Sequence, residues 1–239
     1  LLSGIYKIPS IGCRVFGVFT NTTPVDAYRG AGRPEATYLV ERMVDRFAQE
    51  IGRDPLMVRR KNMIAPFKNG YVVDGLGGMV EYDSGNYKGA LNKALEMFDY
   101  KDFRRKQKQA RREGRFIGVG FSTYIEICGM APSSVAASLG AGAGLWESST
   151  LRVHPTGSVT VYTGTSPHGQ GHETTFAQLV ANQLGIPMEE IEVLHGDTAA
   201  QQFGTGTFGS RSVPVGGTAL QMSLEKVTQK AKKIAAHQM

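Results

Sequence analysis

Apolar residues recur at a helical period in the first quarter of the chain. After Pro34, the apolar positions between 38 and 47 lie on one face of a helix, and this pattern predicts a helix that stops at Gly52. Asp54 as N-cap and Pro55 as the first helical residue predict a second helix directly afterwards. The polar residues between the apolar positions assign the opposite face of each helix to solvent.

The same period predicts further helices at 86–98, 101–115 and roughly 172–184, and a terminal helix beyond the glycine-rich stretch 201–217. Alternating and β-branched stretches instead predict strands. These lie at 12–21, around 79–85, and at 116–129, 146–155, 157–165 and 189–197. A Pro-Thr-Gly turn at 155–157 joins two of them, and 129–144 is predicted to be a small-residue loop. Helices and strands mix without a regular βαβ alternation, so the pattern favours an α+β fold.

Composition restricts the class of protein. The chain has 239 residues, 41% hydrophobic and 20% charged, enough for one large or two small domains. It shows neither an apolar run of the ~20 residues that a membrane span needs nor a secretory signal pattern. Cys13 and Cys128 are far apart and form no metal-binding motif, so the sequence predicts a reduced, cytoplasmic setting.

The net charge of +6 is concentrated locally, because 101–115 carries eight basic residues against two acidic ones. That stretch is interpreted as a solvated helix rather than a nucleic-acid site, since no aromatic residue beyond Phe103 is available to stack on bases. The chain opens without methionine and ends inside a well-formed helical pattern. We therefore expect it to be a piece of a larger subunit.

Three glycine-rich loops each precede a helix. They are AYRGAGR at 27–33, TSPHGQGHET at 165–174 and FGTGTFGSRS at 203–212, the last with Ser210 and Ser212 as possible caps. Free N–H groups at a helix start, together with the peptide dipoles, favour an anion, and glycines allow close approach of the main chain.

Charged and polar side chains in these loops strengthen the prediction. Arg29, Arg33 and Arg211 can add forked hydrogen bonds to phosphate or oxo groups, and Gln170 can both donate and accept. Neither the P-loop motif nor the dinucleotide GxGxxG motif is present. The loops therefore predict one extended anionic ligand that is not a conventionally bound nucleotide.

Four stretches in order resemble the molybdenum-binding large subunit of the xanthine dehydrogenase and aldehyde oxidase family, nearest to its carbon monoxide dehydrogenase-type branch. They are 27–64, GVGFSTYIEICG at 118–129, GQGHETTFAQLVANQLGIP at 169–187 and GTGTFGSRSVP at 204–214. The resemblance implies a molybdenum hydroxylase that uses water-derived oxygen on an aldehyde or heterocyclic carbon. It implies molybdopterin with Mo, as the cytosine dinucleotide, and iron–sulfur clusters and FAD on partner subunits.

The resemblance and the loops together assign cofactor-binding residues. They are Arg29, Gly169, Gln170, Gly171, Thr207, Phe208, Gly209, Ser210 and Arg211. Arg29 matches an arginine whose main chain lies beside the molybdenum, Gln170 a glutamine that bonds the pterin, and 208–210 the segment passing the metal. On this basis, 1–115 is predicted to be a first cofactor-binding segment and 116–239 a second.

Ala31, Phe121 and Ser122 match positions that line the substrate pocket in the family. Purine-hydroxylating members have phenylalanine where this chain has Ala31, so the resemblance implies a pocket without that stacking wall. Carbon monoxide dehydrogenases read AYRCSFR, with a cysteine that bridges to copper, where this chain has Gly30. Oxidation of carbon monoxide at a molybdenum–copper centre is therefore not expected.

No catalytic residue and no metal ligand is assigned within the chain. The family's general base is a glutamate in a Gly-Val-Gly-Glu-like segment that this chain lacks. Glu35 and Glu173 are each explained by complementing a helix dipole. Two alternatives are open for Glu126: a half-buried carboxylate with a raised pKa, or one that faces outward. His168 and His172 are interpreted as supporting or surface groups, because dithiolene sulfurs hold the metal in this family.

The leading hypothesis is the cofactor-binding part of a hydroxylase large subunit, inactive without the rest of that subunit and its iron–sulfur and FAD partner subunits. A small-molecule substrate is expected, with neither nucleic acid nor a membrane span. The alternative is a non-catalytic fragment or assembly module of such a subunit.

Overall fold

The structure of the chain, a computed structural model, describes residues 2–75, 78–129, 133–138 and 140–239. These residues form two compact units, and each is described by itself. The first unit comprises residues up to Ala27 together with Ala31–Ile125, and the second comprises Tyr28–Gly30 and Glu126–Met239. The units differ from the predicted cofactor-binding segments at 28–30, which belongs with the second unit, and at 116–125, which belongs with the first. The predicted α+β class is confirmed, because helices and strands are mixed in each unit.

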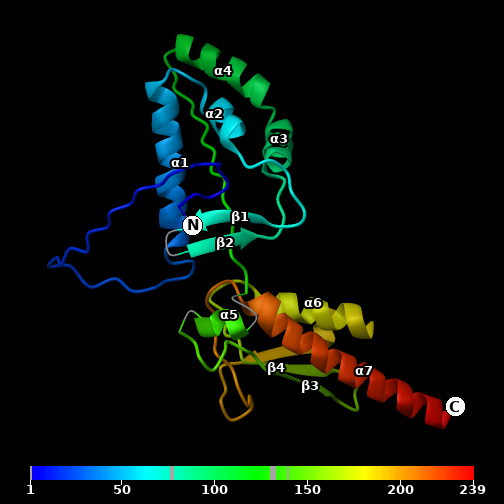
Figure 1. The fold of residues 1–239 in the computed structure, drawn as a ribbon. Helices are drawn as coiled ribbons and strands as arrows, with labels where there is room; N and C mark the ends of the chain where they lie inside the picture. The colour runs from blue at the N-terminus through cyan, green and yellow to red at the C-terminus, as the bar shows by residue number, and fades with distance from the viewer. Residues whose placement is uncertain (1, 76–77, 130–132, 139) are drawn as a thin grey trace. The chain divides into compact units, whose positions relative to one another are not determined.

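Four helices and a hairpin make up the first unit (Figure 1). They are α1 (Arg33–Glu50), α2 (Pro55–Asn62), β1 (Tyr71–Gly75), β2 (Gly78–Tyr82), α3 (Tyr87–Phe98) and α4 (Tyr100–Arg112). All four helices were predicted, whereas β1 was not. β1 and β2 pair antiparallel, with Tyr71 opposite Tyr82.

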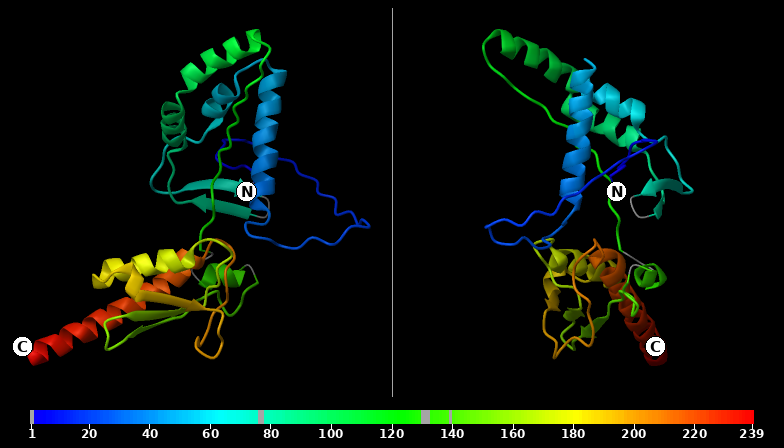
Figure 2. Two further views of the ribbon diagram at one scale, coloured as in Figure 1. Left: turned by 180° about the vertical axis from the view of Figure 1, so that it is seen from behind. Right: turned by 60° about the vertical axis from the view of Figure 1, so that its left-hand side comes forward.

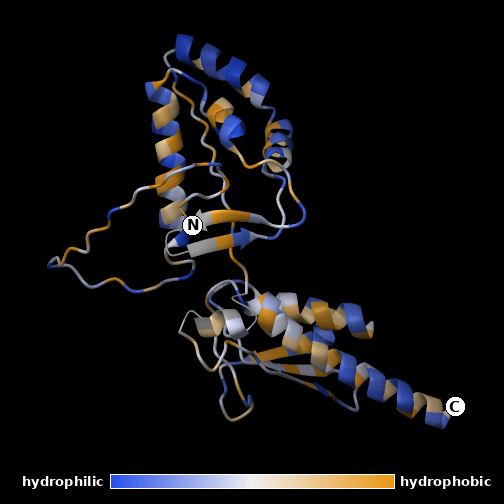
Figure 3. Ribbon diagram, in the orientation of Figure 1, coloured by the Kyte–Doolittle hydropathy of each residue, from blue (hydrophilic) through white to orange (hydrophobic). Residues whose placement is uncertain are grey.

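Side-chain caps explain where the predicted helices begin. Asp54 accepts hydrogen bonds from the N–H groups of Leu56 at 2.8 Å and Met57 at 3.3 Å, which satisfies two free donors at the start of α2. Asn86 accepts from Gly89 N at 3.0 Å and starts α3 in the same way. Figure 3 shows α4 mostly in hydrophilic colours, as expected for a solvated basic helix.

A buried ion pair connects α1 and α2 in the first unit. The guanidinium of Arg59, whose side chain is 0% exposed, donates from Nε to Glu41 Oε2 at 3.0 Å and from Nη1 to Asp45 Oδ1 at 2.7 Å. Tyr6 donates its hydroxyl to Glu41 Oε1 at 2.6 Å. Beside this network lies an apolar cluster of Ile5, Tyr6, Leu56, Met63 and Leu91.

The strand predicted at 116–129 is not formed. Side-chain groups replace a strand partner there: Arg59 Nη2 donates to Phe121 O at 3.2 Å, and Thr123 N donates to Glu41 Oε2 at 3.0 Å. The strand predicted at 12–21 is also wrong, because that stretch is extended and exposed and pairs with no other strand in the described part of the chain. Alternation alone does not make a strand when its main-chain donors and acceptors lack a neighbouring ladder.

A three-stranded sheet and two long helices organise the second unit. Its elements are α5 (Ser133–Ser138), β3 (Ser149–Val153), β4 (Val159–Thr163), α6 (His172–Leu184), the 3₁₀ turn η1 (Met188–Glu190), β5 (Ile191–His195), the π-helix η2 (Ser212–Gly217) and α7 (Thr218–Gln238). The strand order is β3-β4-β5, with β3 antiparallel and β5 parallel to the central β4. The three strands and α6 lie where the sequence predicted them.

The core of the second unit lies between the sheet and its two long helices. Val159 and Val161, two residues apart on β4, point to the same face and meet Phe176 of α6 and Leu220 of α7. Both views in Figure 2 show α6 and α7 on that face. Each of these four side chains is at most 2% exposed, so they hold α6 and α7 firmly on β4.

Two predicted details of the second unit are corrected. The predicted loop at 129–144 contains α5, although residues 130–132 and 139 lie outside the described part. Neither Ser210 nor Ser212 caps α7, because η2 precedes that helix and Gly217 is its N-cap. A side-chain cap is not needed where a preceding helical turn already supplies the acceptors.

Candidate functional site

The three glycine-rich loops meet within the second unit. Tyr28–Gly30 of the first loop belongs to this unit, and Arg29 donates from Nη1 to His168 O in the second loop at 3.3 Å. Ser166 N of the second loop donates to Thr207 Oγ1 of the third at 3.0 Å. The residues in contact are 139 and 41 positions apart in the sequence, so the three loops share one place, as expected if they serve one ligand.

The second loop relies on glycine conformations. Gly169 and Gly171 have φ of 91° and 77°, values that favour glycine. A Cβ on Gly169 would lie 3.4 Å from Arg29 Nη1, an ordinary contact, so the requirement for glycine there comes from its φ. Gln170 is exposed, and its Oε1 accepts a hydrogen bond from His168 N. In this structure the side chain therefore bonds to the main chain of its own loop.

The second loop ends at the start of α6, where Gly171 is the N-cap and provides no side-chain acceptor. Glu173 lies in the first turn. Its own main-chain N–H, and after it the side chain of His195 at 3.1 Å, lower the pKa of this carboxyl. The positive end of the helix dipole thus already favours a carboxylate, which agrees with the role expected for Glu173.

The third loop presents Phe208, Gly209 and Ser210 at its exposed tip. Gly209 and Ser210 have φ of 58° and 51°, and the left-handed conformation is unusual for serine. Ser210 Oγ donates to Glu126 Oε1 at 2.8 Å, and Gly129 N donates to Gly209 O at 3.3 Å. Glu126 is exposed, so of the two alternatives weighed, the outward-facing carboxylate is confirmed.

The expectation that the Arg211 side chain binds an anion is corrected. Its side chain is 0% exposed and pairs with Glu147, whose side chain is likewise 0% exposed. Nη1 also donates to Gly206 O at 2.7 Å, and Nη2 donates to Leu145 O at 2.6 Å. The guanidinium is therefore used inside the protein, and a contact of Arg211 with a cofactor remains a prediction for its main chain alone.

His172 is a structural residue of the second unit. It is 3% exposed, its Nδ1 lies 3.5 Å from Thr165 Oγ1, and its ring stacks on Phe176. Burial lowers the pKa of the imidazole from its ordinary value of 6.5. Within the described residues no group of three or more potential metal ligands is found, and none of the described helices has the length and apolarity to cross a bilayer.

The predicted substrate-pocket residues belong to the first unit. Ala31 and Ser122 are exposed there, whereas Phe121 is half-buried and its ring meets Tyr100 edge-on at 5.5 Å. Their role as pocket residues remains a prediction.

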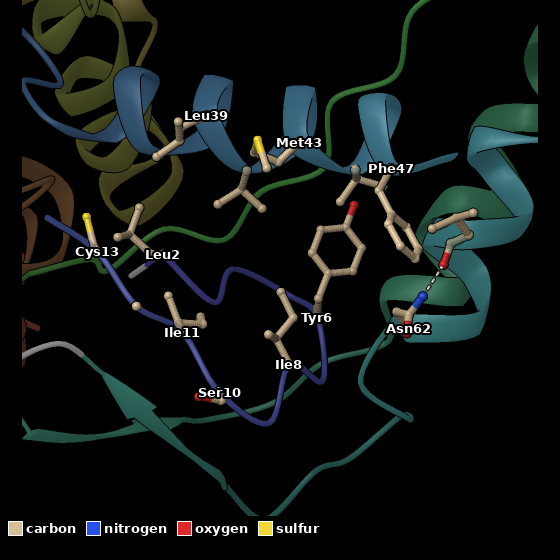
Figure 4. A pocket seen from close by; sticks show the side chains of 14 residues that line it. Leu2, Tyr6, Ile8, Ser10, Ile11, Cys13, Leu39, Met43, Phe47 and Asn62 are labelled. Carbon is tan, nitrogen blue, oxygen red and sulfur yellow. Dashed lines mark hydrogen bonds between the residues drawn. The ribbon is translucent and has the colours of Figure 1, made fainter. Parts of the chain in front are cut away.

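An apolar groove with a volume of about 570 Å³ also lies in the first unit. Figure 4 shows Leu39, Met43 and Phe47 of α1 facing Tyr6 and Ile11 across it. Met43 and Phe47 are 62% and 54% exposed. The apolar residues of α1 that predicted the helix line this groove, and the described residues leave part of that apolar face uncovered.

Three charged residues that position these segments were not predicted. They are Glu41, Arg59 and Glu147, which are 4%, 0% and 8% exposed. The sequence offers a partial signal for Glu41 alone, because it lies between the apolar positions of the α1 stripe. Burial of Arg59 and Glu147 depends on partners far along the chain.

The donors around the three loops fit an extended anion. Arg29 is an exposed guanidinium, and among the described residues no side chain caps the N-terminus of α6. The tip 208–210 adds exposed main chain of unusual conformation. Guanidinium and amide donors with glycine clearance suit phosphate and oxo groups, so the residues present fit a molybdopterin.

Comparison with protein families gives the same result. Two family models described as molybdopterin cofactor-binding domains match residues 93–239 and 1–63. The chain is 43% identical to the carbon monoxide dehydrogenase large chain of Hydrogenophaga pseudoflava and 33% identical to the nicotine 6-hydroxylase large subunit of Paenarthrobacter nicotinovorans. It covers 100% and 99% of itself in these matches, but spans only 30% and 28% of the relatives' lengths.

Solved structures agree. Quinoline 2-oxidoreductase from Pseudomonas putida 86 matches with a TM-score of 0.75 and 33% identity over 95% of this chain and 28% of that one. Carbon monoxide dehydrogenase from Oligotropha carboxidovorans matches with a TM-score of 0.70 and 40% identity over 85% of this chain and 26% of that one. The chain therefore belongs to the molybdopterin cofactor-binding domain family, as found in the large subunits of carbon monoxide dehydrogenase- and xanthine dehydrogenase-type oxidoreductases.

Proposed function

We propose that this chain is the cofactor-holding part of a molybdenum hydroxylase large subunit, and that the complete enzyme oxidises an aldehyde or heterocyclic carbon with oxygen from water. The observation that carries the proposal is the meeting of the three glycine-rich loops in the second unit through Arg29, His168, Ser166 and Thr207. Such a convergence of amides and one exposed guanidinium is what a polyanionic cofactor requires.

The residues of the chain bind and orient the cofactor, molybdopterin as its cytosine dinucleotide. The amides of 169–171 and the guanidinium of Arg29 neutralise anionic groups, and Gln170 turns from His168 N to bond the pterin. Thr207, Phe208, Gly209, Ser210 and the main chain of Arg211 form the wall on the other side. When bound, the cofactor supplies the redox centre at which the substrate carbon is hydroxylated. Fixed donors in this wall need no rearrangement during the reaction, which is how a preorganised site contributes to rate.

The substrate is proposed to be a small molecule other than carbon monoxide. Gly30 has φ of 81°, a conformation that disfavours any residue with a Cβ, and glycine carries no sulfur for copper. Relatives named for nicotine and quinoline suit a heterocyclic substrate. Ala31, Phe121 and Ser122 would contribute to its pocket, with small side chains at the first and last positions.

The rest of the enzyme is proposed to lie outside these 239 residues. The chain spans about 30% of the length of its relatives, so we assign the catalytic glutamate, and much of the pocket, to the remainder of the large subunit. Iron–sulfur and FAD subunits would accept the electrons in the cytoplasm. The uncovered apolar groove beside Met43 and Phe47 is a suitable surface for such polypeptide.

Metal and pterin analysis tests the proposal. The chain, co-expressed with the missing part of the subunit and both partner subunits, should contain molybdenum and a fluorescent pterin, whereas the isolated chain should show no turnover. Arg29→Ala should weaken pterin retention about tenfold, since it removes a charge-assisted donor. Arg14→Ala, at another exposed arginine, is the matched control.

A complex without metal or pterin would favour the alternative, an assembly module. The exposed apolar groove supports that alternative, because it could bind a partner polypeptide. Hydroxylase activity of these 239 residues alone, loaded with metal, would contradict the assignment of the catalytic base to a segment outside them.

A further inference from the structure

A buried ion pair lies beneath the third loop. The side chains of Glu147 and Arg211 are both 0% exposed. Glu147 Oε1 accepts from Arg211 and from three donors of the loop: Thr205 N at 3.1 Å, Thr205 Oγ1 at 2.8 Å and Gly206 N at 3.2 Å. One carboxylate oxygen therefore fixes two consecutive main-chain amides of the loop.

Arg211 connects the end of the same loop to the segment before β3. Its Nη1 donates to Gly206 O at 2.7 Å, and its Nη2 donates to Leu145 O at 2.6 Å. Its guanidinium carbon lies 5.1 Å from the centre of the Phe208 ring, so it also contacts the tip. These bonds hold the loop from both sides of 207–210.

A second set of contacts holds the start of the loop to the same segment. The rings of Trp146 and Phe203 stack with their centroids 3.6 Å apart and their planes at 12°. Ser148 Oγ donates to Phe203 O at 2.6 Å. Gly204 packs so closely on Gly164 that a Cβ on either residue would lie within 2.5 Å of the other's main chain.

The tip held by these contacts is strained. Ser210 adopts φ of 51°, a conformation that persists in a non-glycine residue when its surroundings fix it. Hydrogen bonds from Gly129 N to Gly209 O and from Ser210 Oγ to Glu126 fix the tip from above the pair. The conformation of 208–210 therefore depends on these two hydrogen bonds together with the buried pair, which fixes Thr205 and Gly206 just before the tip and contacts the Phe208 ring.

We propose that Glu147 and Arg211 are positioning residues that hold Phe208–Ser210 in the conformation required to receive the cofactor. This inference rests on the proposed function. Arg211 acts here by hydrogen bonding to the main chain of Gly206 and by contacting the Phe208 ring, and its side chain does not bind an anion itself. The pair is neutral overall and buried, so its contribution is geometric. Its four main-chain partners define where the loop lies.

Hydrogen–deuterium exchange on the whole 239-residue chain tests the pair without any cofactor. Arg211→Met and Glu147→Gln should speed exchange of the amides of Thr205 and Gly206 by about a hundredfold, the scale expected when one partner of a buried pair is removed. Arg211→Lys keeps the charge but loses the fork that reaches both Gly206 O and Leu145 O, so it should exchange nearly as fast.

Fluorescence gives an independent readout, because Trp146 is the one tryptophan of the chain. Its quenching by acrylamide should rise in Arg211→Met and stay unchanged in Arg152→Met, the matched control at an exposed arginine of β3. Unchanged protection of β4 amides in each variant shows that the second unit is folded. If Arg211→Met loses that protection, the exchange of Thr205 and Gly206 in the milder Arg211→Lys tests the proposal instead.

Wild-type exchange at Thr205 and Gly206 in the folded Arg variants would overturn the proposal. So would a co-expressed Arg211→Met complex that lacks pterin while exchange stays wild-type, because that result assigns Arg211 to direct binding. A wild-type complex without pterin would instead contradict the proposed function and leave the exchange result to decide on the pair.

Discussion

Replacing Arg59 by methionine should destabilise the first unit by about 3 kcal/mol, because the change removes the cation from a buried ion pair. Desolvation lowers the pKa of Arg59, but Asp45 and Glu41 outweigh it and leave that pKa raised, so the group is charged at any ordinary pH. Methionine keeps an unbranched apolar side chain of similar reach, so the loss is mainly that of the guanidinium.

The magnitude follows from what each partner loses. Removing one partner of a buried pair costs about 3–5 kcal/mol. Glu41 still accepts hydrogen bonds from the hydroxyls of Tyr6 at 2.6 Å and Thr123 at 2.9 Å. These bonds stabilise part of its charge, so the lower end of the range of about 3–5 kcal/mol applies. That figure includes about 1 kcal/mol for the donor lost by Phe121 O, and Asp45, whose side chain is 31% exposed, is rehydrated at little cost.

Urea denaturation followed by far-ultraviolet circular dichroism measures the change, since α1 and α2 lie in this unit. Arg60→Met on the same helix is the control: its Nη2 contacts Asn92 at 2.6 Å in an exposed position, and it should cost about 0.5 kcal/mol. An Arg59→Met loss no greater than that of Arg60→Met would refute the reasoning. The double variant with Glu41→Leu should be more stable than the sum of its single changes, because no buried charge is left unpaired.

Two further outcomes are expected in the second unit. Gly164→Ala should cost about 1–3 kcal/mol, because its Cβ would meet Gly204 Cα at 2.5 Å. Gly142→Ala in the same unit, with nothing within 4 Å of its Cβ, should be near neutral. Thermal denaturation compares the two variants, and equal losses would contradict the close approach. Because the pKa of His172 is lowered in the folded protein, the unfolded chain takes up the proton at a higher pH than the folded one. The contribution of His172 to stability is therefore complete above pH 6.5, and it is lost as the pH falls from 6.5 towards the pKa of the folded protein. His172→Gln should remove this part of the pH dependence in urea titrations, and an unchanged profile would contradict it.

Local signals in the sequence were sufficient for most helices and for the three-stranded sheet. Asp54 and Pro55 start α2 by contacts within three residues, and the α1 stripe needs no distant partner to be recognised. Such features depend on neighbours in the sequence, so a pattern can find them. The convergence of the three loops was also predicted, from the shared chemistry of their helix starts.

Long-range partners decided the rest. The stretch 116–125 has the composition of a strand, but Glu41 and Arg59, 82 and 62 residues away, take its main-chain groups instead. Arg211 looks like a free anion-binding side chain until Glu147, 64 residues earlier, is placed against it. A charged residue is normally a surface residue, and no local pattern reveals which one is buried.

The π-helix η2 limits how the length of this part of the chain can change. It joins the fixed position of Arg211 to Leu220 and Leu224, both 0% exposed in the core. Removing one residue from 212–217 would restore α-helical spacing but turn α7 by about 100° relative to the loop. Both leucines would then leave the core. A single-residue deletion within 212–217 should therefore destabilise the second unit, while single-residue insertions should be tolerated in the exposed stretch 196–200.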